Sequence, residues 1–218
     1  MTQVSSLLRF VPTERELTEA DLVALAQVTV ELDATYLPVA GRSRQEQFRW
    51  YPTASALGVN EALLRGLHVG GGDPLTRAKK AAAVLLFASD SPLANIEAEL
   101  MKHMRNTAAA GPIRSVAART RDVSDAVATI CRVRGYQLPD EVGLSKLGVR
   151  LEIGLPSRIG AVAAILGARL SRVEYLKLLA EGLDTIAALQ SAGDTLHSIL
   201  GDDRAEQALQ WIADPVDR

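Results

Sequence analysis

The sequence contains few of the residues that build disulfides and β-sheet cores. Cys131 is the only cysteine in 218 residues, which excludes an intrachain disulfide and makes a reducing compartment the expected environment. Aromatic residues make up only 4% of the chain, whereas strands are enriched in aromatic and β-branched side chains. Period-two alternation is nowhere sustained, apart from a short extended piece at Thr35–Val39. With abundant alanine and leucine, these absences predict an all-α fold.

Motifs of familiar catalytic chemistry are also missing. No Gly-Lys-Ser/Thr follows the single glycine run, Gly70–Gly72, so we expect this run to be a flexible connection between helices instead of a phosphate loop. His68, His103 and His197 are far apart, and none lies near Cys131. There is no Gly-x-Ser-x-Gly nucleophile elbow. The chain alone is therefore expected to be non-catalytic, unable to hydrolyse ATP, and without a metal or cofactor of its own.

Long hydrophobic runs are absent as well. The longest, Ala81–Ala88 and Ile159–Leu166, are far shorter than the roughly 20 residues that a membrane-spanning helix needs. The residues after Met1 do not form a basic region followed by an apolar run, as a signal peptide would. We therefore expect a cytoplasmic protein with no membrane partner.

Charge is unevenly distributed along the chain. Residues 101–172 contain 12 Lys and Arg against 5 Asp and Glu, a net charge of +7, although the whole chain carries −2. The flanking segments are both acidic, at −3 for residues 1–100 and −6 for residues 173–218. A basic middle segment favours a polyanionic partner, with chance clustering on a solvated surface as the alternative.

Helix start and stop signals divide the chain into two predicted parts. Thr18 precedes an acidic turn and an apolar-periodic run, and Asp73-Pro74 places a capping side chain before a proline, so each predicts a helix start. A boundary is expected near Gly154-Leu155-Pro156, which gives a multi-helix bundle over residues 1–154 and a small helical domain over 155–218. In the second part, breaks between short helices are expected at glycines 167, 182, 193 and 201.

One long helix is predicted over Pro112–Arg134, because the segment opens after Gly111 and runs uninterrupted to Gly135. At about 100° per residue, one narrow stripe carries apolar side chains and a threonine. The stripe comprises Val116, Thr120, Val123, Val127 and Ile130. Arg114, Arg121 and Arg132 fall on the opposite stripe, with Asp125 between them and in position to pair with Arg121. Such a helix is either an ordinary bundle helix with a solvated face or a rod that holds a nucleic-acid strand.

The runs AAGPIRSVAARTRDV and KLGVRLEIGLPSRIGAVAAILGARLSRVEYLKLLAEGL resemble the C-terminal region of Ski2-like superfamily 2 DNA helicases. The resemblance covers residues 94–183. It implies a ratchet domain followed by a helix–hairpin–helix-like domain, and single-stranded DNA as partner. It also implies helicase motor domains, in cis or in trans, that bind ATP and Mg²⁺.

The resemblance assigns roles to individual residues of the long helix. In the family, this ratchet helix contacts the unwound strand through an arginine and, two turns later, through an aromatic side chain that stacks on a base. Arg114 matches the arginine. The aromatic position falls on Arg121, a departure that weakens base stacking. Lys102 and Arg105 are expected to assist Arg114, Arg121 and Arg132.

Two further segments are candidate contacts. In Gly167–Arg172, a glycine turn beside Arg169 and Arg172 would offer backbone N–H groups and guanidiniums to a phosphate. The similar turn at Leu200–Arg204 contains two acids, so we expect it to be structural only. Trp50, which follows Arg49, is expected to be a core residue, with a basic–aromatic nucleic-acid contact as the alternative.

The cationic helix is compatible with a region that binds single-stranded nucleic acid, and the resemblance implies that this region belongs to an ATP-dependent DNA helicase whose motor lies outside this chain. Two other functions stay open. One is a helical protein–protein interaction module or adaptor, which would expose an apolar patch. The other is a small-molecule enzyme whose site is assembled from distant residues, which would require a deep pocket with polar walls.

Overall fold

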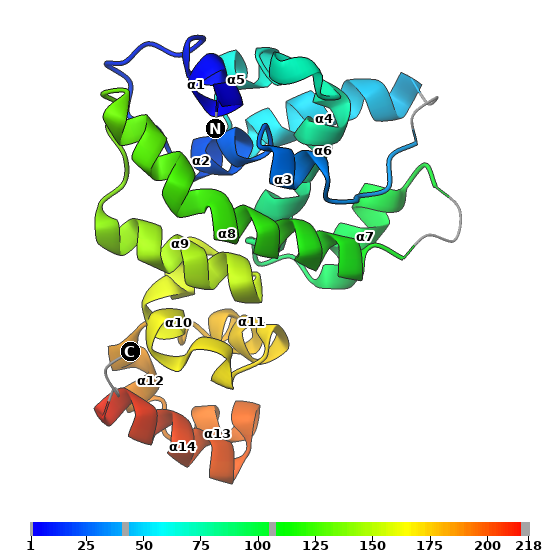
Figure 1. Cartoon of the computed structure of the whole chain (residues 1–218). Helices are drawn as coiled ribbons and strands as arrows, with labels where there is room; N and C mark the ends of the chain where they lie inside the picture. The colour runs from blue at the N-terminus through cyan, green and yellow to red at the C-terminus, as the bar shows by residue number, and fades with distance from the viewer. Residues whose placement is uncertain (1, 41–43, 105–107, 215–218) are drawn as a thin grey trace. The chain divides into compact units, whose positions relative to one another are not determined.

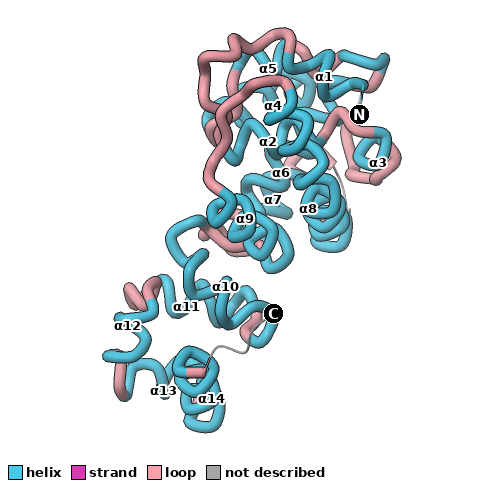
Figure 2. The backbone as a smooth tube through the Cα atoms, turned by 60° about the vertical axis from the view of Figure 1, so that its left-hand side comes forward, coloured by secondary structure: helices cyan, strands magenta, loops and turns pink. Residues whose placement is uncertain are grey.

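The computed structural model of the chain describes residues 2–40, 44–104 and 108–214. Within those ranges every regular element is a helix, as Figures 1 and 2 show, which confirms the predicted all-α class. Thr35–Val39 forms no strand there and follows α3 as irregular backbone.

The chain divides into two compact units, residues 1–87 with 91–144 and residues 88–90 with 145–218, here unit 1 and unit 2. The helices of unit 1 are α1 (Thr2–Leu8), α2 (Glu19–Ala26), α3 (Val30–Asp33), α4 (Arg44–Ala56), α5 (Glu61–Arg65), η1 (Val69–Gly71), α6 (Pro74–Phe87), α7 (Leu93–Met101) and α8 (Ala110–Val133). The division falls at Ser145, inside α9 (Glu141–Ile153), and not at the boundary expected near Gly154. Gly154 and Pro156 do follow the end of a helix, but that helix is α9, which continues without a break across the division at Ser145.

The core of unit 1 is built around α6, which packs against α2, α4, α7 and α8. Helix α2 begins where the sequence predicts, with Thr18 and Asp21 forming a capping box. Helix α6 begins at Pro74, and Asp73 accepts hydrogen bonds from the N–H groups of Leu75 and Thr76. Both predicted helix starts are therefore confirmed.

Three cations of α6 are buried, which the sequence analysis did not anticipate: Arg77, Lys79 and Lys80. The Arg77 guanidinium makes a bidentate contact with Asp33 and donates to the carbonyls of Leu67 and Val69, each at 2.6 Å. A Cβ on Gly72 would lie 2.2 Å from Arg77 Cζ. The glycine run connects α5 and α6, as expected of an interhelical connection, and its last glycine also lies against a buried arginine.

The core of unit 2 is a separate cluster of buried apolar side chains between Leu155 and Ile212. Its elements are η2 (Ser157–Ile159), α10 (Gly160–Leu166), η3 (Gly167–Arg169), α11 (Arg172–Ala180), α12 (Ile186–Ser191), α13 (Asp194–Leu200) and α14 (Asp202–Ala213). The four glycines predicted as breaks, at 167, 182, 193 and 201, all adopt positive φ between these helices. The prediction of short helices separated by glycines is confirmed.

Candidate nucleic-acid interface

Helix α8 is the long helix that the sequence predicts, and both of its ends are fixed by specific contacts. Ala109 offers no capping side chain, so the carboxylate of Glu97 on α7 accepts the N–H groups of Ala109 and Ala110, at 2.8 and 2.6 Å. At the other end Gly135 adopts φ +84° and donates to Arg132 O, while Tyr136 N–H donates to Cys131 O. This pair of bonds is a Schellman motif, which terminates the helix at the predicted glycine.

The apolar stripe of α8 faces the core of unit 1. Val116, Val123 and Val127 are buried, as expected, and Ile130 is half-buried. Thr120 is fully buried, donates its hydroxyl to Val116 O at 2.8 Å and accepts from Gln27 Nε2 at 3.1 Å. The helix is therefore held in one rotation about its axis, and its opposite stripe is directed outward.

On the outward stripe, Arg114 and Arg132 are exposed, and neither has an ion-pair partner in the described part of the chain. Arg121 is half-buried and pairs with Asp122 at 3.1 Å, and Arg119 lies 3.6 Å from the same carboxylate. The predicted acid between the arginines, Asp125, is also exposed. The face is thus cationic at both ends and partly neutralised in the middle.

The two predicted helpers lie before α8 in the chain. Lys102 is exposed at the C-cap of α7, where a cation also suits the negative end of the helix dipole. Arg105 lies outside the described residues. Arg119 is exposed but lies five positions after Arg114, about 140° away around the helix, so it is not part of the predicted stripe; it shares the carboxylate of Asp122 with Arg121.

The predicted phosphate hairpin of unit 2 is built differently from the expectation. Gly167 is buried, and its N–H donates to Ala163 O as the C-cap of α10. The Arg169 guanidinium lies 4.9 Å from the ring centroid of Trp211 and donates to Ile165 O. Arg172 donates to Gly154 O at 2.7 Å and to a backbone carbonyl at Ser89, at 3.0 Å. These three residues therefore make contacts that hold unit 2 together. Fewer of their N–H donors are left to bind a phosphate.

The second turn, at Gly201, contains an internal contact as well. His197 Nδ1 lies 3.1 Å from the carboxylate of Asp202 in the first turn of α14. Arg204 forms an ion pair with Glu174 and donates to the carbonyl of Arg169.

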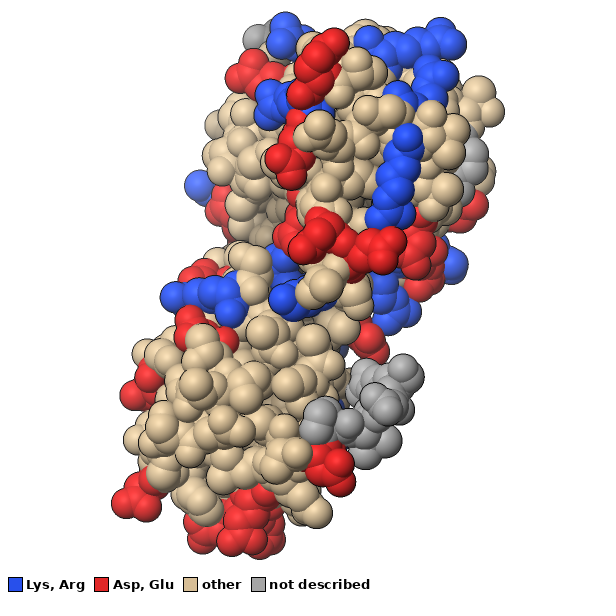
Figure 3. Space-filling model, turned by 90° about the vertical axis from the view of Figure 1, so that its left-hand side faces the viewer, with Lys and Arg blue, Asp and Glu red and all other residues tan. Residues whose placement is uncertain are grey.

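Figure 3 shows acidic side chains gathered at one end of unit 2 and basic and acidic side chains interspersed over unit 1.

Trp50 is a core residue, as predicted, with no solvent-accessible surface. Two cations lie close to its ring, with Arg49 Cζ 4.6 Å and Lys79 Nζ 5.0 Å from the ring centroid. Because the indole is sealed, it does not offer a stacking surface to a base.

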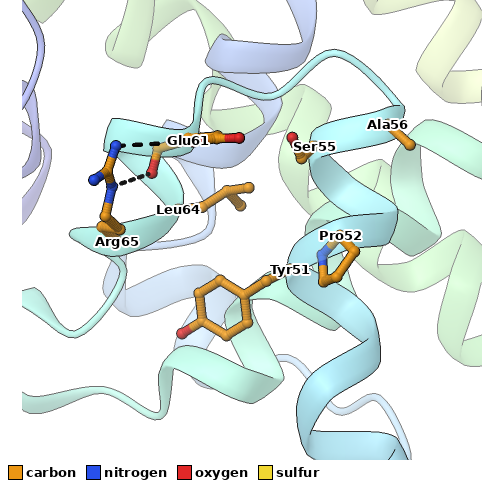
Figure 4. A pocket seen from close by; sticks show the side chains of 7 residues that line it. All are labelled: Tyr51, Pro52, Ser55, Ala56, Glu61, Leu64 and Arg65. Carbon is orange, nitrogen blue, oxygen red and sulfur yellow. Dashed lines mark hydrogen bonds and ion pairs between the residues drawn. The ribbon is translucent and has the colours of Figure 1, made fainter.

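A hollow of about 610 Å³ opens between α4 and α5. Figure 4 shows Tyr51 and Leu64 on its walls, with the ion pair of Glu61 and Arg65 (3.9 Å) at its edge. Burial, with a smaller contribution from Asp73, raises the pKa of the Tyr51 hydroxyl. The lining is mainly apolar, and among the described residues neither Tyr51 nor Ser55 makes a hydrogen bond with Glu61.

The described residues contain no group of three His, Cys, Asp or Glu side chains placed to share a metal ion. No single helix in those ranges is long and apolar enough to cross a bilayer, although the bent pair formed by α9 and residues 157–169 meets the criterion of length and composition jointly. Comparison with models of protein families, with curated proteins and with solved structures finds no match to this chain.

Proposed function

We propose that this chain binds single-stranded nucleic acid, DNA in the first place, along the outward face of α8. Arg114 and Arg132 support this function because both guanidiniums are exposed and neither is neutralised by a described carboxylate. They are 18 positions apart, which at roughly 1.5 Å per residue separates them by about 27 Å along the helix. A stacked strand with about 3.4 Å between phosphates would present roughly eight phosphates over that length.

The proposed binding is electrostatic and independent of base sequence. Arginine suits it because the planar guanidinium binds phosphate through two donors and also stacks on bases. Lys102 would extend the cationic face beyond the N-terminal end of α8. Arg121, which shares Asp122 with Arg119, would contribute less than Arg114 or Arg132.

We further propose that the chain is the strand-holding region of an ATP-dependent helicase. Its support is the resemblance of residues 94–183 to Ski2-like helicases, together with the long helix over the segment that resembles the ratchet helix. ATP and Mg²⁺ would bind to motor domains outside this chain. The strand on α8 would be held while the motor advances, which is how a non-catalytic region can contribute to unwinding.

The test is fluorescence anisotropy of an internally labelled 20-nucleotide single strand titrated with the chain at several salt concentrations. The expected plot of log affinity against log salt is a straight line whose slope decreases by roughly 0.7 for each phosphate contact removed. Arg114→Ala/Arg132→Ala should therefore weaken binding and flatten the slope by about 1.4. Arg65→Ala, which removes an exposed arginine of α5, is the matched control and should change neither.

Salt-independent binding, or equal affinity of the double variant and the unmodified chain, would exclude this interface. A duplex of the same sequence should bind less tightly, because its bases are not available for stacking on arginine.

The alternative function, a protein–protein interaction module, is favoured by the hollow between α4 and α5. Its walls of Tyr51, Pro52, Ala56 and Leu64 would accept an apolar side chain of a partner. If this is the function, affinity capture will yield a protein partner that nuclease treatment does not remove, and Leu64→Asp will abolish the capture. Capture that survives nuclease but depends on Arg114 and Arg132 would instead place the partner on α8.

A further inference from the structure

A second cationic feature lies where α8 ends. A hollow of about 460 Å³ is lined by Arg9, Val11, Thr13, Val133, Arg134 and Tyr136. Arg9 directly follows α1, and Arg134 is the C-cap of α8, so the hollow joins two segments that are distant in the sequence. Two of the lining residues carry a guanidinium and two, Thr13 and Tyr136, carry a hydroxyl, whereas none is an Asp or Glu.

The fold holds these two arginines at one place through Tyr136. The phenol oxygen of Tyr136 is buried and lies 2.6 Å from Leu8 O and 2.7 Å from Val11 O. Leu8 is the residue before Arg9, and Gly135 is the only residue between Tyr136 and Arg134. The Schellman turn at Gly135 directs the tyrosine back under the helix end, so the backbones that carry both arginines are fixed relative to each other.

Both guanidiniums are available to a ligand. Arg9 and Arg134 are exposed, and neither side chain makes a hydrogen bond or ion pair within the described ranges. Glu14 is the acid nearest in the sequence, but it accepts the Thr13 hydroxyl at 3.4 Å and is not part of the lining. The hollow therefore combines a concave surface with two guanidiniums that make no ion pair, while the Glu14 carboxylate, outside the lining, is close enough for its charge to act on Tyr136.

We infer that this hollow binds the terminal phosphate of a nucleic-acid strand whose backbone runs along α8. The inference rests on the proposed function: a strand that leaves the α8 face at Arg132 would turn around the end of the helix to reach Arg134, two positions later and about 200° further around the helix axis. Val133, which is 81% exposed, lies between them and offers an apolar surface to the sugar or base of the last nucleotide. The site would fix the position of a strand end, which the row of arginines alone cannot do.

Charge distinguishes a terminal phosphate from an internal one. A phosphate monoester carries about −1.5 to −2 at pH 7, with a second pKa near 6, whereas an internal phosphodiester carries −1. Two arginines, which stay protonated throughout, match the monoester dianion and can bind it through paired donors. The preference for a phosphorylated end should therefore diminish as pH falls below about 6.

The experiment compares three 20-nucleotide single strands that carry the same internal label and end in 5′-hydroxyl, 5′-phosphate or 3′-phosphate. At pH 7.5 we expect one of the two phosphorylated strands to bind roughly three- to tenfold more tightly than the unphosphorylated strand. Arg9→Ala/Arg134→Ala should remove this advantage and leave most of the affinity for the unphosphorylated strand. Arg9→Lys/Arg134→Lys should retain only part of it, because lysine does not bind phosphate through two donors.

The controls separate this inference from the proposed function. Arg15→Ala removes an exposed arginine of the same unit outside the lining and should preserve the advantage. Equal binding of all three strands would overturn the terminal-phosphate site while leaving the α8 interface intact, and no binding of any strand would overturn both. A phosphoserine peptide or inorganic phosphate that binds as tightly as the phosphorylated strand, with the same sensitivity to the double variant, would also overturn the assignment to a strand end.

Discussion

Glu46 on α4 and Lys79 on α6 form an ion pair in which both side chains are fully buried. The ammonium lies beside the ring of Trp50, at 5.0 Å from its centroid. Burial lowers the pKa of Lys79, and the contact with Glu46 partly opposes that shift. The pair joins two helices that are distant in the sequence, at the cost of removing two charges from water.

Replacing one partner of this pair should lower the free energy of unfolding far more than replacing both partners. Lys79→Met removes the buried ammonium that pairs with the Glu46 carboxylate, so the free energy of unfolding should fall by up to about 3–5 kcal/mol. Glu46→Leu/Lys79→Met replaces the pair with apolar groups and should recover most of that loss. Urea denaturation followed by circular dichroism measures both values. If the two variants lose the same stability, an unpaired buried charge is not the cause of the loss in Lys79→Met.

The Glu97 cap should contribute to the stability of α8. Glu97→Ala leaves the N–H groups of Ala109 and Ala110 without their carboxylate acceptor, and we expect a loss of about 1 kcal/mol in the free energy of unfolding. Hydrogen exchange should accelerate at those two amides. Glu206→Ala removes an exposed acid of α14 and serves as the control, with an expected change near zero.

Cys131 should make stability depend on pH in the alkaline range. Burial raises the pKa of its thiol to about 12, against about 8.5 in an unfolded chain. Between these values the unfolded state binds fewer protons than the folded state, so this residue's contribution to stability decreases as pH rises. The decrease should not exceed about 1.4 kcal/mol per pH unit.

The measurement is the stability of the unmodified chain minus that of Cys131→Ala, taken at intervals from pH 7 to pH 11. The difference should fall steadily above about pH 8.5. A thiol reagent should also modify the native chain only as fast as it unfolds. Rapid labelling under native conditions would show that the thiol is accessible and would contradict the expected pH dependence.

Gly72 should tolerate no side chain, because a Cβ there would meet the Arg77 guanidinium. Its φ of −72° is ordinary, so the expected penalty is steric and not conformational. Gly72→Ala should lose about 1–3 kcal/mol in a denaturation experiment. Gly111→Ala is the contrasting substitution, since nothing lies within 4 Å of a Cβ there, and it should stabilise α8 slightly.

Asp125 should oppose the binding of a strand, because it places a negative charge on the same face as Arg114 and Arg132. Asp125→Asn removes that repulsion and should tighten binding of a single strand by about two- to fivefold at low salt. The gain should disappear at high salt. Asp194→Asn, at an exposed site in unit 2, should leave the affinity unchanged. Unaltered affinity in Asp125→Asn would mean that the strand does not pass over the middle of α8.

The sequence was sufficient to locate α8, its buried stripe and its glycine end. A 24-residue helix contains more than six turns, so its apolar period is unmistakable, and a glycine with positive φ is the usual way to end such a helix. The same reasoning located the short helices of unit 2. Whether α8 binds a strand is a separate matter that periodicity does not decide.

The buried cations could not be predicted, because a local pattern treats lysine and arginine as surface residues. Lys80 is buried since its ammonium donates to the carbonyl of Leu32, which lies 48 positions away. The hollow at the end of α8 depends on a contact between Tyr136 and Leu8, 128 positions apart. In the same way, Arg169 and Arg172 resembled phosphate ligands in the sequence, but the structure engages them with an indole and with backbone carbonyls.

The chain's two tryptophans are divided between the units, Trp50 in unit 1 and Trp211 in unit 2. The first indole is sealed from water, and the second is only half-buried beneath a guanidinium. Their intrinsic emission should therefore differ in wavelength, and Trp50→Phe or Trp211→Phe would leave a single optical reporter for one unit. Melting curves recorded at the two wavelengths would reveal directly whether the two hydrophobic cores lose their structure in one cooperative event or in succession.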